Sequence, residues 1–241
     1  MEAIDASSRP SFALAANAGP LQREGRVASL LTPAPGEGAT LEVRWIRPGA
    51  LTTSSIEWFG PISAEIETRE DLYFIGEHVP GVSLKIRGGV QLDLKLSRGT
   101  RGALDLPGWP RTEIRSWQKW SFPLASGFKV DLQGPEWVSV RKIRRIRVFS
   151  PAGKVPAERD PRRNHEGSCA VELTDVSVVG ERWWTLGFEA KGRSAATPAS
   201  ILAAAGLVFA DPLPQGLKLD AADAMSYADW LRVRAFIPSG G

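Results

Sequence analysis

The chain is poor in the residues on which several common kinds of site depend. Its 241 residues contain a single cysteine, Cys169, which excludes an internal disulfide framework and a zinc site built from several thiolates. Because Cys169 opens a predicted strand, we expect a packed side chain rather than a nucleophile. His165 lies in a polar stretch and is expected at the surface. Neither a GxGxxG nor a Walker phosphate-binding motif is present, and no Ser-His-Asp spacing supports nucleophilic catalysis.

Long hydrophobic runs are also missing. No window approaches the length of a membrane span, and the first residues are acidic where a signal peptide carries basic residues. We therefore expect a cytoplasmic protein with no membrane partner. The formal net charge is only +3, so local clusters of Arg and Lys carry more information than the total charge.

The composition divides the chain into two parts. Residues 1–39 mix Ala, Pro, Gly and Ser without a steady period and are expected to form a poorly ordered N-terminal segment. Residues 40–241 are expected to form one domain, since they show neither an internal repeat nor an alternating βαβ pattern.

Residues 81–96, GVSLKIRGGVQLDLKL, have the clearest local pattern. Two alternating runs flank Gly88-Gly89, as in a β-hairpin with a tight turn. One face is apolar and contains Val82, Leu84, Ile86, Val90, Leu92 and Leu94. The other is polar and contains Ser83, Lys85, Arg87, Gln91, Asp93 and Lys95. Such a hairpin faces a core on one side and either water or a polar ligand on the other.

The rest of the domain reads as further strands followed by helices. Strands are predicted at residues 40–47, 64–75, 116–124, 128–132, 137–149, 169–179 and 182–190, with a loop at 97–110. A short helix is predicted at 54–59, and two more at 198–210 and 221–233. In the strand at 182–190, Trp184 is expected in the core and Trp183 at a rim. The pattern predicts an α+β fold.

The polar faces of these strands have two interpretations. On an open sheet they are the solvated side, and charges of both signs need no function there. Closed into a barrel, they line a channel in which unpaired charges are too costly without a partner. Since bases outnumber acids on this face as assigned, the partner is expected to be anionic. Several Arg forks could hold a chain of phosphates, and carboxylates could hold a bridging divalent cation.

Several short motifs occur in the order seen in a known family. They are LEVRW, TREDLYF, GVSLKIR, LDLKL, VRKIRRIRVF, VELTDV, WWTLGFEAKG and SYADWL, between residues 40 and 235. The chain thereby resembles the CYTH superfamily of triphosphate tunnel metalloenzymes, and more closely its divergent members. The resemblance implies an antiparallel barrel of about eight strands enclosing a tunnel, with flanking and C-terminal helices. In that family, basic tunnel residues bind triphosphate, and carboxylates bind Mg²⁺ or Mn²⁺ for hydrolysis or cyclisation.

Carried onto this sequence, the resemblance and the strand faces together predict a site. The expected ligand-binding residues are Arg44, Arg69, Lys85, Arg87, Lys95, Arg141 and Arg145. The expected ligands of Mg²⁺ or Mn²⁺ are Glu42, Glu172 and Glu189. Arg144 and Lys142 are expected to face away from the tunnel.

The first strand departs from the family pattern. Its hallmark is Glu-x-Glu-x-Lys, whereas this chain has Glu42-Val43-Arg44-Trp45-Ile46. Arginine therefore replaces the second carboxylate, and isoleucine replaces the lysine. Arg44 would repel a metal ion and could pair with a carboxylate instead.

Three hypotheses follow. The first is a metal-dependent phosphohydrolase acting on inorganic triphosphate or a nucleoside triphosphate. The second is a non-catalytic protein that binds polyphosphate or a phosphorylated metabolite. The third is RNA binding through the basic strand at residues 141–147 together with exposed tryptophans.

Overall fold

We analysed a computed structural model of the chain. It describes residues 38–60, 65–76, 79–125, 136–150, 157–159, 167–191 and 198–235. Most of the predicted N-terminal segment, the strand predicted at 128–132, and His165 lie outside the described residues.

Nine strands form one antiparallel sheet in the described part of the chain. They are β1 (Ala39–Pro48), β2 (Glu65–Phe74), β3 (Val82–Arg87), β4 (Gln91–Leu104), β5 (Thr112–Pro123), β6 (Trp137–Ser150), β7 (Ala157–Arg159), β8 (Cys169–Val178) and β9 (Glu181–Lys191).

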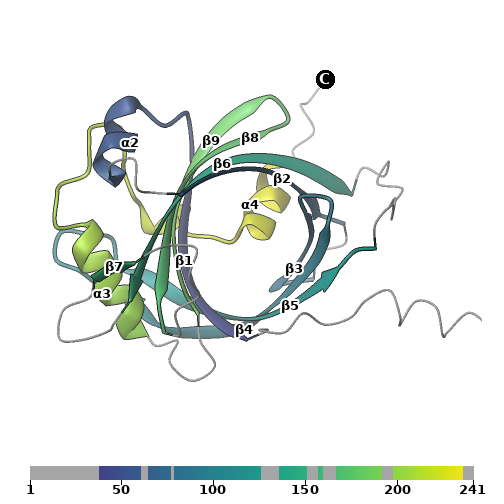
Figure 1. Ribbon diagram of the computed structural model, residues 1–241, viewed down its shortest axis with the longest axis horizontal. Helices are drawn as coiled ribbons and strands as arrows, with labels where there is room; N and C mark the ends of the chain where they lie inside the picture. The colour runs from purple at the N-terminus through teal and green to yellow at the C-terminus, as the bar shows by residue number, and fades with distance from the viewer. Residues whose placement is uncertain are drawn as a thin grey trace, which may run out of the picture.

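The sheet closes on itself. The strand order is β2-β3-β4-β5-β1-β9-β8-β6, and β6 pairs with β2 to complete a ring of eight strands. Short β7 is attached to the end of β6. Figure 1 shows the ring nearly end on. Closure removes the exposed sheet edges and makes one face of every strand an inner wall, which confirms the predicted barrel.

The hairpin is formed as predicted. Gly88 and Gly89 have φ of 54° and 74°, values that residues with a Cβ rarely adopt and that a tight turn between twisted strands needs. Ser83 pairs with Lys95 and Lys85 pairs with Asp93, so their side chains share the inner face. The apolar face points outward, where Ile86 is buried, Leu84 and Leu94 are half-buried and Val90 is exposed.

One hydrophobic core lies outside the barrel wall. The outward side chains of β1, β8 and β9 pack against α2 (Thr53–Phe59) and α3 (Pro198–Val208), which lie beside the ring in Figure 1. Trp184, Leu186 and Phe188 belong to this core, as predicted for Trp184. Ile201 and Ala204 of α3 are fully buried against it.

A second core closes one end of the barrel. After a 3-10 turn (Ala221–Asp223), α4 (Tyr227–Ala235) brings Trp230 and Leu231 against inward residues of β1, β2, β6, β8 and β9, and in Figure 1 it appears within the ring. Ala224 forms a bridge with Trp45, and Met225 N donates to Arg44 O. These backbone contacts hold the segment just before α4 against β1. The barrel is therefore plugged by its own C-terminal helix.

Three local predictions were wrong. The stretch at residues 97–110 is not all loop, because β4 continues to Leu104 through bulges near Ser97, Thr100 and Gly102 that interrupt its alternation. The last helix starts only at Tyr227, since the residues before it run along β1. Trp183 is not at a rim but packs edge-on against Trp230, with ring centroids 5.1 Å apart.

None of the helices in the described residues is long and apolar enough to cross a membrane.

We predict that Trp230→Ala lowers the free energy of unfolding by about 3–5 kcal/mol, because it removes a large side chain that is 2% exposed and leaves a cavity in the plug. Urea denaturation measures the change. Val233→Ala is the matched control on the same helix, since Val233 is 61% exposed, and it should be nearly neutral. Equal effects of the two substitutions would contradict the placement of α4.

Candidate functional site

The inward faces of the strands surround a cavity of about 350 Å³. Eleven of its lining residues are basic and five are acidic. The basic ones are Arg44, Arg69, Lys85, Arg87, Lys95, Arg111, Arg115, Lys119, Lys142, Arg144 and Lys191. The acidic ones are Glu42, Asp93, Glu113, Glu172 and Glu189. Asp71 and Glu67 also pair with cations of this wall and bring the acidic groups to seven, so the cavity is a polar tunnel with a surplus of positive charge.

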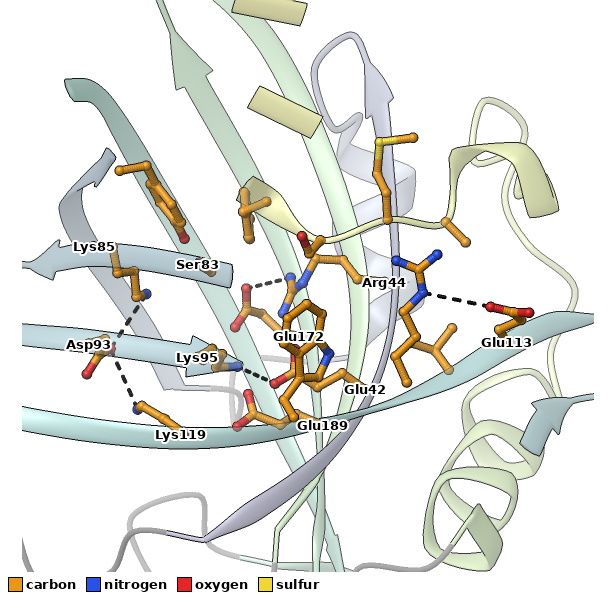
Figure 2. Close-up of a pocket in the computed structure, with 18 of the residues that line it drawn as sticks. Glu42, Arg44, Ser83, Lys85, Asp93, Lys95, Glu113, Lys119, Glu172 and Glu189 are labelled. Carbon is orange, nitrogen blue, oxygen red and sulfur yellow. Dashed lines mark hydrogen bonds and ion pairs between the residues drawn. The ribbon is translucent and has the colours of Figure 1, made fainter. Parts of the chain in front are cut away.

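Asp93 on β4 is the centre of one cluster. Arg87 Nη2 lies 2.7 Å from Asp93 Oδ2, and Lys119 Nζ and Lys85 Nζ lie 3.6 and 3.9 Å from it. Figure 2 shows the two lysines reaching Asp93 from the strands on either side. Burial alone would raise the pKa of this carboxyl, but the three cations outweigh it and hold the pKa at about 2. Three cations thus share one carboxylate.

Asp71 on β2 is the centre of a second cluster. Its side chain is fully buried, and Lys85 Nζ and Lys142 Nζ each lie 3.0 Å from Oδ2. Arg69 Nε lies 2.8 Å from Oδ1. Lys85 belongs to both clusters, so five cations surround the two aspartates.

Burial and neighbouring cations lower the pKa values of three lysines in the tunnel. Burial, together with neighbouring cations such as Arg87, lowers the pKa of Lys85 and of Lys119 to about 8. Burial, and then Lys85, places the pKa of Lys142 well below its ordinary value. These ammonium groups would be more stable beside a further anion.

A third group extends across three neighbouring strands in one register row. Arg44 on β1 faces Gly187 on β9, which faces Glu172 on β8. Arg44 Nη1 lies 3.1 Å from Glu172 Oε1, and this pair is drawn in Figure 2. A Cβ at residue 187 would lie only 2.7 Å from Arg44 Cζ, so glycine leaves the space in which the guanidinium crosses β9.

Glu172 is fully engaged by this group. Oε1 also accepts from Thr174 Oγ1 at 2.8 Å, and Oε2 accepts from Nε of Arg144 at 2.9 Å and from its Nη2. Although burial raises the pKa of a carboxyl, Arg44 and Arg144 place the pKa of Glu172 well below its ordinary range.

The other two predicted metal ligands are also paired with cations. Glu42 accepts from Lys95 Nζ, and Glu189, its cross-strand partner, lies 4.0 Å from Lys191 Nζ. Burial alone would raise the pKa of Glu189, but Lys95 and Lys191 lower it. Within the described ranges, no three His, Cys, Asp or Glu side chains are grouped so that they could hold a metal ion. Glu42, Glu172 and Glu189 all line the tunnel, but they do not form a ready metal site.

The plug contributes an aromatic surface to the tunnel. The ring centroid of Tyr227 lies 3.8 Å from Lys142 Nζ and 5.0 Å from Arg44 Cζ, and its hydroxyl is 3.2 Å from that of Thr185. Burial raises the pKa of Tyr227 to about 12. The helix that closes the barrel therefore also holds two of the buried cations in place.

The structure places five of the seven predicted ligand-binding residues on the tunnel wall: Arg44, Arg69, Lys85, Arg87 and Lys95. The prediction that Arg141 and Arg145 face the tunnel is wrong. Arg141 is exposed, and Arg145 Nη1 pairs with Asp175 at 3.1 Å outside the barrel. Lys142 and Arg144, which were expected to point away, take their place inside.

The error on β6 has a simple origin. Basic residues occupy both of its faces, so alternation does not show which face is inner, and only pairing with Glu67 and Glu172 fixes Arg144 inside. The sequence interpretation also missed Lys119. The alternation of Lys119 and Ser121 against Trp120 and Phe122 could have placed it with Asp93.

Comparisons with known proteins found only distant similarities. No family model matches the chain, and no curated protein matches it. Among solved structures, a conserved hypothetical protein from Pyrococcus furiosus is similar with a TM-score of 0.39 and 18% identity, covering 78% of this chain and 98% of that one. The capping enzyme triphosphatase of Mimivirus is similar with a TM-score of 0.37 and 13% identity, covering 73% and 92%.

Because both TM-scores are below 0.5, what this chain binds has to be inferred from its own residues. The closed eight-stranded barrel and its polar tunnel agree with the fold that the resemblance of the sequence motifs implied.

We predict that Gly187→Ala lowers the free energy of unfolding by about 1–3 kcal/mol, because the new methyl group displaces Arg44 from Glu172. Gly206→Ala in α3 is the control, since a Cβ there meets nothing within 4 Å, and it should be neutral or stabilising. Chemical denaturation of both variants measures the difference, and an unchanged Gly187→Ala protein would argue against the crossing of Arg44 over β9.

Proposed function

We propose that the tunnel binds a short phosphate chain, with inorganic triphosphate as its simplest form. The observation that carries this proposal is the pair of clusters around Asp71 and Asp93, in which two carboxylates are surrounded by five cations, one of which, Arg69, also pairs with Glu67. Buried positive charge in this excess is costly unless an anion neutralises it.

The arrangement of the cations favours a chain of phosphates over a single small anion. Arg69, Lys85, Arg87, Lys119 and Lys142 come from four different strands, and Lys95 and Arg44 extend the basic wall along β4 and β1. Donors that converge from many sides can each meet a different phosphate oxygen, and guanidinium groups match phosphate geometry well. The volume of about 350 Å³ is within the range of small-molecule sites.

Hydrolysis has less support than binding. Metal-dependent phosphate release needs carboxylates that are free to hold the ion, whereas Glu42 and Glu172 accept hydrogen bonds from cationic side chains. Nucleic-acid binding also has less support, because Lys142 and Arg144 of the basic strand face the tunnel rather than solvent.

We predict that inorganic tripolyphosphate binds the protein and raises its melting temperature. Lys119→Gln should weaken binding roughly tenfold or more, since it removes a charge from the Asp93 cluster while Arg87, Gln91 and Ser121 still hold the carboxylate. Isothermal titration calorimetry measures both affinities.

Arg141→Gln is the matched control, because it also removes one positive charge from the chain but on the outer surface of β6. Its affinity should equal that of the wild type. An equal loss in both variants would indicate a general charge effect, and no binding to the wild type at millimolar tripolyphosphate would refute the proposal.

We also predict that binding takes up protons near pH 8. Lys85 and Lys119 have pKa values of about 8, and a bound anion raises them, so affinity falls as the pH rises through this value. Calorimetry in two buffers of different ionisation enthalpy gives the proton count. At pH 8 the Lys119→Gln protein should take up about half a proton fewer than the wild type, since one half-protonated group has been removed. Identical counts would exclude Lys119 from the linkage.

A further inference from the structure

Arg44 places a positive charge on the tunnel wall where the family pattern has a negative one. Arg44 and Glu42 point to the same inner wall, with Arg44 at the position where the family hallmark has its second glutamate. In this structure the guanidinium reaches Glu172 across β9, so a cation that belongs to the chain already occupies the space between the wall of β1 and this carboxylate.

The two guanidiniums at Glu172 leave no open coordination position on it. Arg44 and Thr174 donate to one oxygen and Arg144 donates twice to the other. A divalent cation needs several carboxylate oxygens at close range and would lie beside Arg44 and Arg144, both of which repel it. Arginine also keeps its charge at every physiological pH, whereas a lysine can lose its proton when burial lowers its pKa.

Gly187 indicates that the arrangement is built into the sheet. Any residue with a Cβ at 187 would meet the end of the Arg44 side chain, and Gly187 lies between Arg44 and Glu172 in one register row, so the guanidinium reaches Glu172 across a residue without a side chain. On the other side, Tyr227 of the plug covers Arg44. Three strands and one helix therefore position this one cation.

We propose that Arg44, together with Arg144, supplies the positive charge that a divalent metal ion supplies in a metal-dependent tunnel, so that this protein binds its phosphate chain without a metal. This inference rests on the proposed function. It adds that the phosphate chain binds as the free anion, without a bound metal ion. Glu42 then serves to position Lys95, and Glu172 to position Arg44 and Arg144, while Glu189 pairs with Lys191, rather than all three coordinating an ion.

The first test uses the unmodified protein. Inorganic tripolyphosphate is titrated into it in a buffer with EDTA and, separately, in a buffer with excess Mg²⁺. We expect binding in EDTA at least as tight as in Mg²⁺. Binding in the Mg²⁺ buffer alone would overturn the inference and leave the proposed function standing, whereas binding in neither buffer would contradict the proposed function itself.

A second test looks for the metal directly. Mn²⁺ alone is added to the protein, and its electron paramagnetic resonance signal reports the free ion. We expect the signal to match that of Mn²⁺ in buffer, and a saturable loss of signal would overturn the inference.

The role of Arg44 is tested with Arg44→Gln, which removes the charge and keeps a polar side chain. In EDTA this variant should bind tripolyphosphate at least tenfold more weakly than the wild type. Arg145→Gln is the control, because it also breaks an arginine–carboxylate pair, that with Asp175, but outside the barrel. It should bind as the wild type does.

Affinity of Arg44→Gln equal to that of the wild type would remove Arg44 from the proposal. Thermal melting of both variants shows whether they are folded, and the experiments on the unmodified protein decide the question of the metal independently of either variant.

Discussion

Pairing of buried charges is the constraint on which the rest of the structure depends. When eight alternating strands close into a ring, their polar faces change from a solvated surface into the wall of a tunnel. Charged groups there lose water and need partners. The tunnel carboxylates Glu42, Asp71, Asp93 and Glu172 have cationic partners from other strands, so ion pairs hold the wall together across the barrel.

The same pairing explains why the tunnel is suited to an anion. Around Asp71 and Asp93 the cations outnumber the carboxylates, because each aspartate faces three cations and only Lys85 is common to both. A fully balanced wall would be only structural, as in other buried ion-pair networks. The excess gives the cavity an affinity for negative charge, and burial, together with neighbouring cations, lowers the pKa values of Lys85 and Lys119.

The helix that closes the barrel also contacts the buried charges. Trp230 and Leu231 fill one end of the barrel with apolar side chains, while Tyr227 turns its ring toward Lys142 and Arg44. The charged layer is thus covered by an aromatic surface at the plugged end. Exclusion of water at this layer strengthens the electrostatic interactions of its charged groups, including those with any ligand.

Local patterns determined much of this from sequence. Strict alternation in residues 82–96 and 181–191 and the glycines of the turn at 88–89 are local properties, so the strands, their hairpins and the inward direction of Lys85, Arg87, Asp93 and Lys95 could be predicted. The departure at Arg44 was also visible, since it needs only the order of residues in one strand.

Only the tertiary structure decided which groups meet. On β6 both faces are basic, so the choice of Lys142 and Arg144 over Arg141 and Arg145 required the register with β2 and β8. The crossing of Arg44 over Gly187 to Glu172 joins residues more than 120 positions apart, and no local pattern contains it. Side-chain direction along a strand is a property of the strand itself, whereas partnership across a closed barrel depends on register and closure, which the whole chain sets together.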